Sequence, residues 1–174
     1  STHPDFNSRI VEAIILSIME TTEALIQNPN DYDARAEFAW VAIQALNGLT
    51  PAGTQGGSFP NHLIEHALSA LFNVAHGAGL AIVIPAWMKY YKEQNLPQFE
   101  RFADKIFAVS SADEGIRKLE AWFSKIGAPV TLAQANIPKE SINELATNAS
   151  QMAVVWGMDS LYTKETIIEI LNKA

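Results

Sequence analysis

Three of the four histidines in this 174-residue chain lie in one short stretch and could together bind a metal ion. His62 and His66 are four residues apart, so on a helix they project from the same face, one turn apart. His76 follows His62 by fourteen residues, beyond a predicted helix break at Asn73 or Val74. If the chain folds back at that break, His76 comes to lie beside the first two imidazoles.

The chemistry of such a cluster suits Zn²⁺ or Fe²⁺, which accept neutral imidazole nitrogen and usually carboxylate oxygen as well. His76 is expected to begin a helix, where the helix dipole disfavours the charged form of its ring. Two or three imidazoles are an incomplete set of ligands. We expect Glu65 on a different side of the helix from His62, and HLIEH at residues 62–66 is not the HExxH motif. The missing ligands are therefore expected from elsewhere in space or from residues outside this chain.

A second interpretation needs no metal. A histidine on a partly apolar helix face is often a hydrogen-bonded structural residue, and a helical module with structural histidines stays open as the alternative. Other catalytic templates are absent, because the sequence has neither GxGxxG after a strand, nor a P-loop, GxSxG or SxxK. The four tryptophans are spread over different predicted helices, and we interpret them as core residues.

Composition narrows the class of protein. Apolar residues make up 48% and charged residues 18%, which indicates a globular domain, and a net charge of −7 argues against a nucleic-acid partner. The chain has no cysteine, so it has neither disulfides nor thiolate ligands, and we expect a cytoplasmic location. No apolar run approaches the roughly 20 residues of a membrane span, so no membrane association is expected.

The elements that position the histidines are all predicted to be helices, because apolar residues recur at steps of three and four and no segment alternates like a strand. Asn7 or Ser8 is the expected cap of the first helix. An Ala-rich second helix, capped by Asp31, is expected to be central because it is so apolar. A glycine-rich loop at 49–59 is either a ligand-binding loop or a plain connection.

Pro85 predicts a kink or restart near Ile84. The expected helices are 8–27, 31–46, 60–72, 76–94, 97–107, 113–126, 138–153 and 163–171, with 128–136 irregular or a short helix.

The stretch NHLIEHALSALFNVAHGAGLAIVIPAWMKY at 61–90 resembles the histidine-rich signature of the iron-containing alcohol dehydrogenase family. More narrowly, it is similar to the NAD(P)H-dependent butanol dehydrogenase branch. QALNGL at 44–49 resembles the segment before that signature, and the helical remainder matches the family's C-terminal half. The resemblance implies one all-α domain over residues 1–174, a dehydroquinate synthase-like helical domain of about seven to nine helices.

The resemblance also implies a site and its partners. His62 and His76 match two of four expected ligands to Fe²⁺ or Zn²⁺. His66 matches a family histidine near the nicotinamide and substrate, a candidate for proton relay. Phe59 falls where that branch has an aromatic residue near the substrate pocket. The implied activity is NAD(P)-dependent interconversion of a small alcohol and an aldehyde, in a homo-oligomer.

The chain departs from the family pattern at its start. It begins at Ser1 and has no DxxxH before Asn7, where the family has its other two ligands, and it has no N-terminal nucleotide-binding domain. We therefore expect the isolated chain to have no dehydrogenase activity and weak or no metal binding. An apolar face that would meet the missing domain should be exposed and should favour self-association.

Overall fold

The computed structural model describes residues 5–53 and 58–174, and all regular structure in those ranges is helical. The described helices form two compact units, one within residues 1–58 and one within residues 59–174. The prediction of an all-α chain with seven to nine helices is therefore confirmed. In chain order the elements are α1 (Asp5–Gln27), α2 (Tyr32–Leu46), α3 (Pro60–Phe72), α4 (His76–Tyr91), α5 (Leu96–Phe107), α6 (Ala112–Lys125), α7 (Ile142–Val155) and α8 (Lys164–Leu171), with short 3-10 helices at Lys92–Gln94, Ala133–Ala135 and Lys139–Ser141.

The first unit is a pair of helices, α1 and α2, packed against each other. The described part of α1 already begins at Asp5, so the prediction of a cap at Asn7 or Ser8 is wrong. The Asn7 amide instead donates hydrogen bonds to the carbonyls of Leu49, at 3.3 Å, and Ala52. It thus ties the helix to the loop after α2. The prediction of Asp31 as a cap is confirmed, because its carboxylate accepts from the Ala34 amide at 3.0 Å.

The apolar character of α2 does not make it a central helix. Val41 is its one buried residue, whereas Trp40 is 60% exposed and Leu46 is 86% exposed. The helix packs on α1, and Trp40, Ile43 and Leu46 among its apolar side chains stay exposed. The prediction of a central position is wrong for this unit, and an exposed apolar face is present. The loop prediction at 49–59 falls partly outside the described residues.

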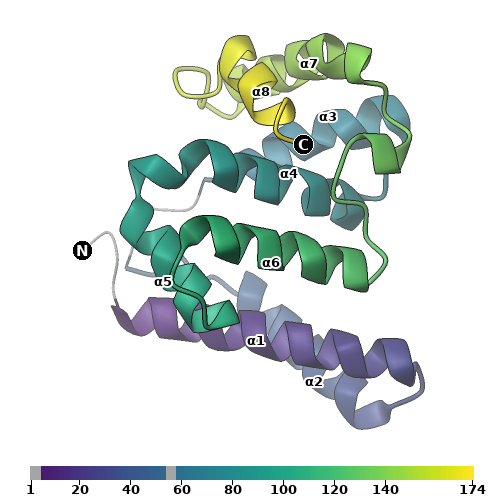
Figure 1. Cartoon of the computed structure of the whole chain (residues 1–174), viewed down its shortest axis with the longest axis vertical. Helices are drawn as coiled ribbons and strands as arrows, with labels where there is room; N and C mark the ends of the chain where they lie inside the picture. Colours follow the sequence, from purple (N-terminus) through teal and green to yellow (C-terminus); the bar gives the residue numbers. More distant parts are fainter. Residues whose placement is uncertain (1–4, 54–57) are drawn as a thin grey trace. The chain divides into compact units, whose positions relative to one another are not determined.

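The second unit contains the main core, formed where α3, α4, α7 and α8 pack together (Figure 1). Helix α7 crosses α3, and α8 contacts both α7 and α4. The fully buried apolar side chains of this core come from all four helices: Leu63, Ile64, Leu68, Ile82, Val83, Leu145, Ile167, Ile170 and Leu171. Because the core anchors α3 and α4 along their apolar faces, these two helices form a firm base for the polar side chains between them.

The remaining helices extend this base. α4 continues through Pro85 without interruption, so the predicted restart near Ile84 is wrong. α6 packs on α4, and α5 packs on α6. At the α5–α6 crossing, Gly115 faces Ala103 so closely that a Cβ on Gly115 would lie 2.6 Å from the Ala103 Cβ. Among the described helices, none has the length and apolar character that crossing a membrane requires.

Candidate metal centre

The α3–α4 hairpin brings the histidines together. Pro60 begins α3, where its missing N–H and fixed φ suit the first turn. Asn73 ends the helix in the left-handed conformation, with φ of 53°, and its N–H bonds to the Ser69 carbonyl. Asparagine tolerates this conformation better than most residues, and α4 then begins directly at His76. The predicted break at Asn73 is therefore confirmed.

The structure places all three predicted imidazoles in one cluster. The ring centroids of His62 and His76 are 5.0 Å apart, and those of His66 and His76 are 5.5 Å apart. His62 Nδ1 lies 3.0 Å from His76 Nε2. Two nitrogens that each lie about 2.1 Å from one metal ion are about 3.0–3.4 Å apart when the angle between them is about 90–109°. The nitrogen pair therefore fits two adjacent positions around one metal ion, although a ring-to-ring hydrogen bond has the same length.

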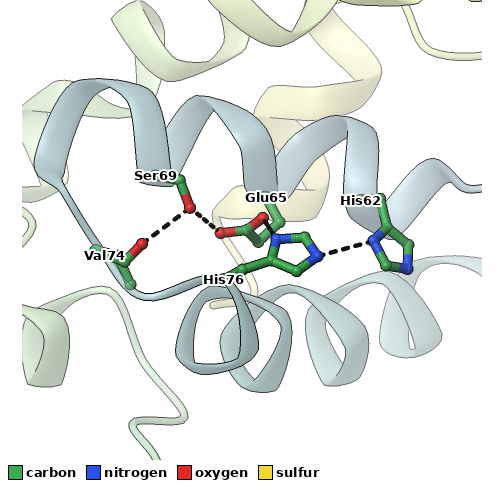
Figure 2. A network of polar contacts seen from close by, with 5 residues as sticks. All are labelled: His62, Glu65, Ser69, Val74 and His76. Carbon is green, nitrogen blue, oxygen red and sulfur yellow. Dashed lines mark hydrogen bonds and ion pairs between the residues drawn. The ribbon is translucent and has the colours of Figure 1, made fainter. Parts of the chain in front are cut away.

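Glu65 completes a polar chain behind the histidines (Figure 2). Its side chain is 0% exposed, and its Oε2 contacts His76 Nδ1. Its Oε1 contacts the hydroxyl of Ser69, one turn further along α3. The same hydroxyl lies 2.9 Å from the Val74 carbonyl, in the turn before α4. The chain of contacts therefore runs from the α3–α4 turn through Glu65 and His76 to His62.

The position of Glu65 contradicts the expectation from the sequence. Residues three apart on a helix are neighbours, so Glu65 lies on the same side of α3 as His62 rather than on a different side. The spacing of Glu65 from His62 was a signal that could have identified it. A carboxylate with a histidine partner is also a common arrangement behind metal-binding imidazoles.

The surroundings of His62 favour its neutral ring. Burial lowers the pKa of His62 below its ordinary value, and the neighbouring His76 and His66 rings lower this pKa further, while the Glu65 carboxylate opposes them. A neutral imidazole has one nitrogen lone pair free, which is the form that binds metals. The His62 side chain is thus held in its ligand-competent form at neutral pH.

Two aromatic side chains border the histidines. Phe59 lies edge-on to His62 with ring centroids 5.6 Å apart, and Trp156, at the end of α7, lies edge-on to His66 at 5.5 Å. Phe59 is 56% exposed and Trp156 is 38% exposed. The interpretation of all four tryptophans as core residues is therefore wrong for Trp156, as it is for Trp40. The sequence offered no signal for Trp156, because α7 meets α3 only through the tertiary fold.

The donor set fits a divalent metal, but incompletely. His62 and His76 offer one converging pair of nitrogens, as the family resemblance implies. Among the described residues, ligand atoms of Glu65, His66 and His76 also lie within 4.8 Å of one another. Both oxygens of Glu65 already have partners, namely the Ser69 hydroxyl and His76 Nδ1. We therefore take the nitrogens of His62 and His76, rather than Glu65, as the metal-binding atoms. This pair leaves at least two positions of a four-coordinate ion to other groups.

The fold and the histidine cluster agree with the family comparison. The C-terminal model of the Fe-containing alcohol dehydrogenase family matches residues 3–174. The chain therefore belongs to that family and corresponds to its C-terminal domain.

Known relatives are similar over most of the chain. The probable NADH-dependent butanol dehydrogenase 1 of Bacillus subtilis is 32% identical over 175 residues, which cover 96% of this chain and 45% of that protein. The crystal structure of NADH-dependent butanol dehydrogenase A from Thermotoga maritima superposes with a TM-score of 0.93 and 43% identity, over 98% of this chain and 46% of that one. The NADPH-dependent aldehyde reductase YqhD of Escherichia coli is 29% identical over 143 residues, which cover 79% of this chain and 37% of that protein. This chain spans less than half the length of these relatives.

Proposed function

We propose that this chain supplies half of a divalent metal site in an NAD(P)-dependent enzyme that interconverts small alcohols and aldehydes. The observation that carries the proposal is the 3.0 Å approach of His62 Nδ1 and His76 Nε2, at the positions that the family resemblance assigns to ligands. Fe²⁺ or Zn²⁺ suits these nitrogens. The remaining ligands and the nucleotide-binding domain come from residues outside this chain.

When bound, the metal supplies a Lewis acid for the alcohol or aldehyde oxygen. His66 lies one helical turn from His62, and in this proposal it relays a proton to or from that oxygen. In the reductive direction, hydride from the nicotinamide C4 forms the new C–H bond, and the carbonyl oxygen takes the proton. In this proposal His66 is the catalytic residue and the candidate contact with the nicotinamide, whereas Phe59 borders the substrate.

Variants of the three histidines test these roles separately. In a protein that joins this chain to the nucleotide-binding half, His62→Ala and His76→Ala should each lose bound metal and NAD(P)H-dependent reduction of a four-carbon aldehyde. His66→Asn should keep the metal and lower kcat about 100-fold or more, because general acid–base catalysis contributes that much. Mass spectrometry measures the bound metal, and initial rates measure kcat. Metal content that survives in the first two variants would refute the ligand assignment.

The alternative is a non-enzymatic helical module whose histidines are structural. The contact between His76 Nδ1 and the buried Glu65 supports it, because that contact links α3 and α4 without any metal. The two functions predict different behaviour of the isolated chain toward Zn²⁺. A metal site predicts weak binding that His76→Ala abolishes, whereas a structural cluster predicts no binding and a loss of stability alone. Dehydrogenase activity is expected in neither case.

Self-association and location also remain proposals. The exposed apolar side chains of α2 support assembly as a homo-oligomer. Light scattering on the isolated chain should therefore report a mass above that of one copy, and a clean monomer would count against it. We keep the cytoplasm as the proposed location.

A further inference from the structure

Glu65 is the one charged side chain that is fully buried among the described residues. The proposed reaction assigns it no role. We propose that Glu65 is a positioning residue that selects the ring nitrogen which His76 offers to the metal. This inference rests on the proposed metal site but concerns a property of the chain that exists without metal.

The proton balance of the contact leads to this role. An ionised carboxylate only accepts hydrogen bonds, so its contact with His76 Nδ1 requires a hydrogen on that nitrogen. A neutral imidazole has only one N–H, and the Nε2 of His76 then carries the lone pair. Nε2 is the nitrogen that lies 3.0 Å from His62 Nδ1. Glu65 thus directs the metal-binding lone pair of His76 toward the second ligand.

The carboxylate is itself fixed from two sides. On α3, the Ser69 hydroxyl contacts Oε1, and that hydroxyl also lies 2.9 Å from the Val74 carbonyl. On α4, Gly79 lies so close that a Cβ there would be 2.4 Å from Glu65 Oε1 and 2.7 Å from its Cγ. A glycine at this position lets the helices approach until the carboxylate fills the space between them. Glu65 therefore has little freedom to release His76.

Two other roles for Glu65 are less consistent with these contacts. A direct metal ligand would need a free oxygen facing the cluster, yet both oxygens have partners and the side chain is 0% exposed. A purely structural link between α3 and α4 would not depend on which nitrogen of His76 carries hydrogen. His76 is 48% exposed, so its ring has room to turn over if the carboxylate is absent. The tautomer of His76 therefore separates positioning from structural linking.

The substitutions Glu65→Gln and Glu65→Leu test the proposal. Gln keeps an oxygen that accepts from Nδ1, and its NH₂ group donates to Ser69, whose hydroxyl then donates to Val74. Leu has a similar volume and no acceptor. Long-range ¹H–¹⁵N spectra of the metal-free chain, at about pH 8.5 where free imidazoles are neutral, report the tautomer directly. We expect hydrogen on Nδ1 of His76 in the native chain and in Glu65→Gln, and its loss from Nδ1 in Glu65→Leu.

Metal affinity provides the second measurement. Titration with Zn²⁺ should give the highest affinity for the native chain, a lower one for Glu65→Gln and the lowest for Glu65→Leu. The affinity of Glu65→Leu should be about 10–100-fold below that of the native chain, as for other partners of metal-binding histidines. His62→Ala is the matched control, because it should lower affinity while the tautomer of His76 stays unchanged. Hydrogen on Nε2 in the native chain, or an unchanged tautomer in Glu65→Leu, would overturn the inference. Equal Zn²⁺ affinity of the native chain and His62→Ala would instead overturn the proposed metal site, with the tautomer result unaffected.

Discussion

Replacing Gly79 by alanine tests how tightly Glu65 is held between α3 and α4. The new Cβ would lie 2.4 Å from Glu65 Oε1, whereas ordinary contacts begin at 3.4 Å, so the carboxylate must move by about 1 Å. A movement of that size draws its oxygens away from His76 Nδ1 or from the Ser69 hydroxyl. The backbone at Gly79 is ordinary helix, so alanine causes no strain of its own.

The expected effect is the balance of three contributions to the free energy of unfolding. Crowding in a packed interior costs about 1–3 kcal/mol. Weakening a hydrogen bond to a buried charged group costs about 1.5–3 kcal/mol. Alanine is the better helix former by about 1 kcal/mol, which offsets part of this cost. We expect a net destabilisation of about 1.5–5 kcal/mol.

Urea unfolding followed by circular dichroism measures this difference. Gly77→Ala is the matched control, since it lies in the same helix and a Cβ there would meet nothing within 4 Å. It should change the stability by at most about 1 kcal/mol, in the stabilising direction. In a Glu65→Ala background the cost of Gly79→Ala should shrink by at least about 1 kcal/mol, which a double-mutant cycle would reveal. Equal stabilities of Gly79→Ala and Gly77→Ala would refute the packing argument.

Three further predictions concern the same unit. Gly115→Ala should lower the free energy of unfolding by about 1–3 kcal/mol, because the new Cβ would lie 2.6 Å from the Ala103 Cβ. Adding Ala103→Gly should recover part of this loss. Burial first, and then the neighbouring imidazoles, lower the pKa of His62. The unfolded chain therefore binds a proton that the folded chain does not, so the free energy of unfolding should fall as the pH drops below 6.5. The fall should be less steep in His62→Asn. Urea unfolding at several pH values measures both. Tyr162→Phe should cost about 1–3 kcal/mol by thermal unfolding, because Trp87 Nε1 donates to the buried Tyr162 hydroxyl at 3.0 Å.

Most of the helical architecture follows from local signals in the sequence. Apolar residues at helical spacing, the cap at Asp31 and the helix break at Asn73 are properties of short segments, and each acts as predicted. The position of α2 could not be predicted in the same way. An apolar helix must bury its face against something, but the sequence of the helix does not say against what, and within its unit much of that face is exposed.

The candidate site shows the same division. The spacing of His62, His66 and His76 was sufficient to predict their cluster, because a single turn brings them together. Glu65 was within reach of the same reasoning, since it follows His62 by three residues on one helix. Trp156 could not be predicted in this way, because its contact with His66 depends on how α7 packs on α3.

The most direct test of the account is to locate the metal itself. Crystals of this chain, alone or joined to the nucleotide-binding half, can be grown with Zn²⁺ and measured at wavelengths on either side of the zinc absorption edge. We predict one anomalous peak about 2.0–2.1 Å from both His62 Nδ1 and His76 Nε2, with Glu65 still on His76 Nδ1. A peak bound by Glu65, or zinc bound elsewhere while the two rings share a hydrogen bond, would contradict the account.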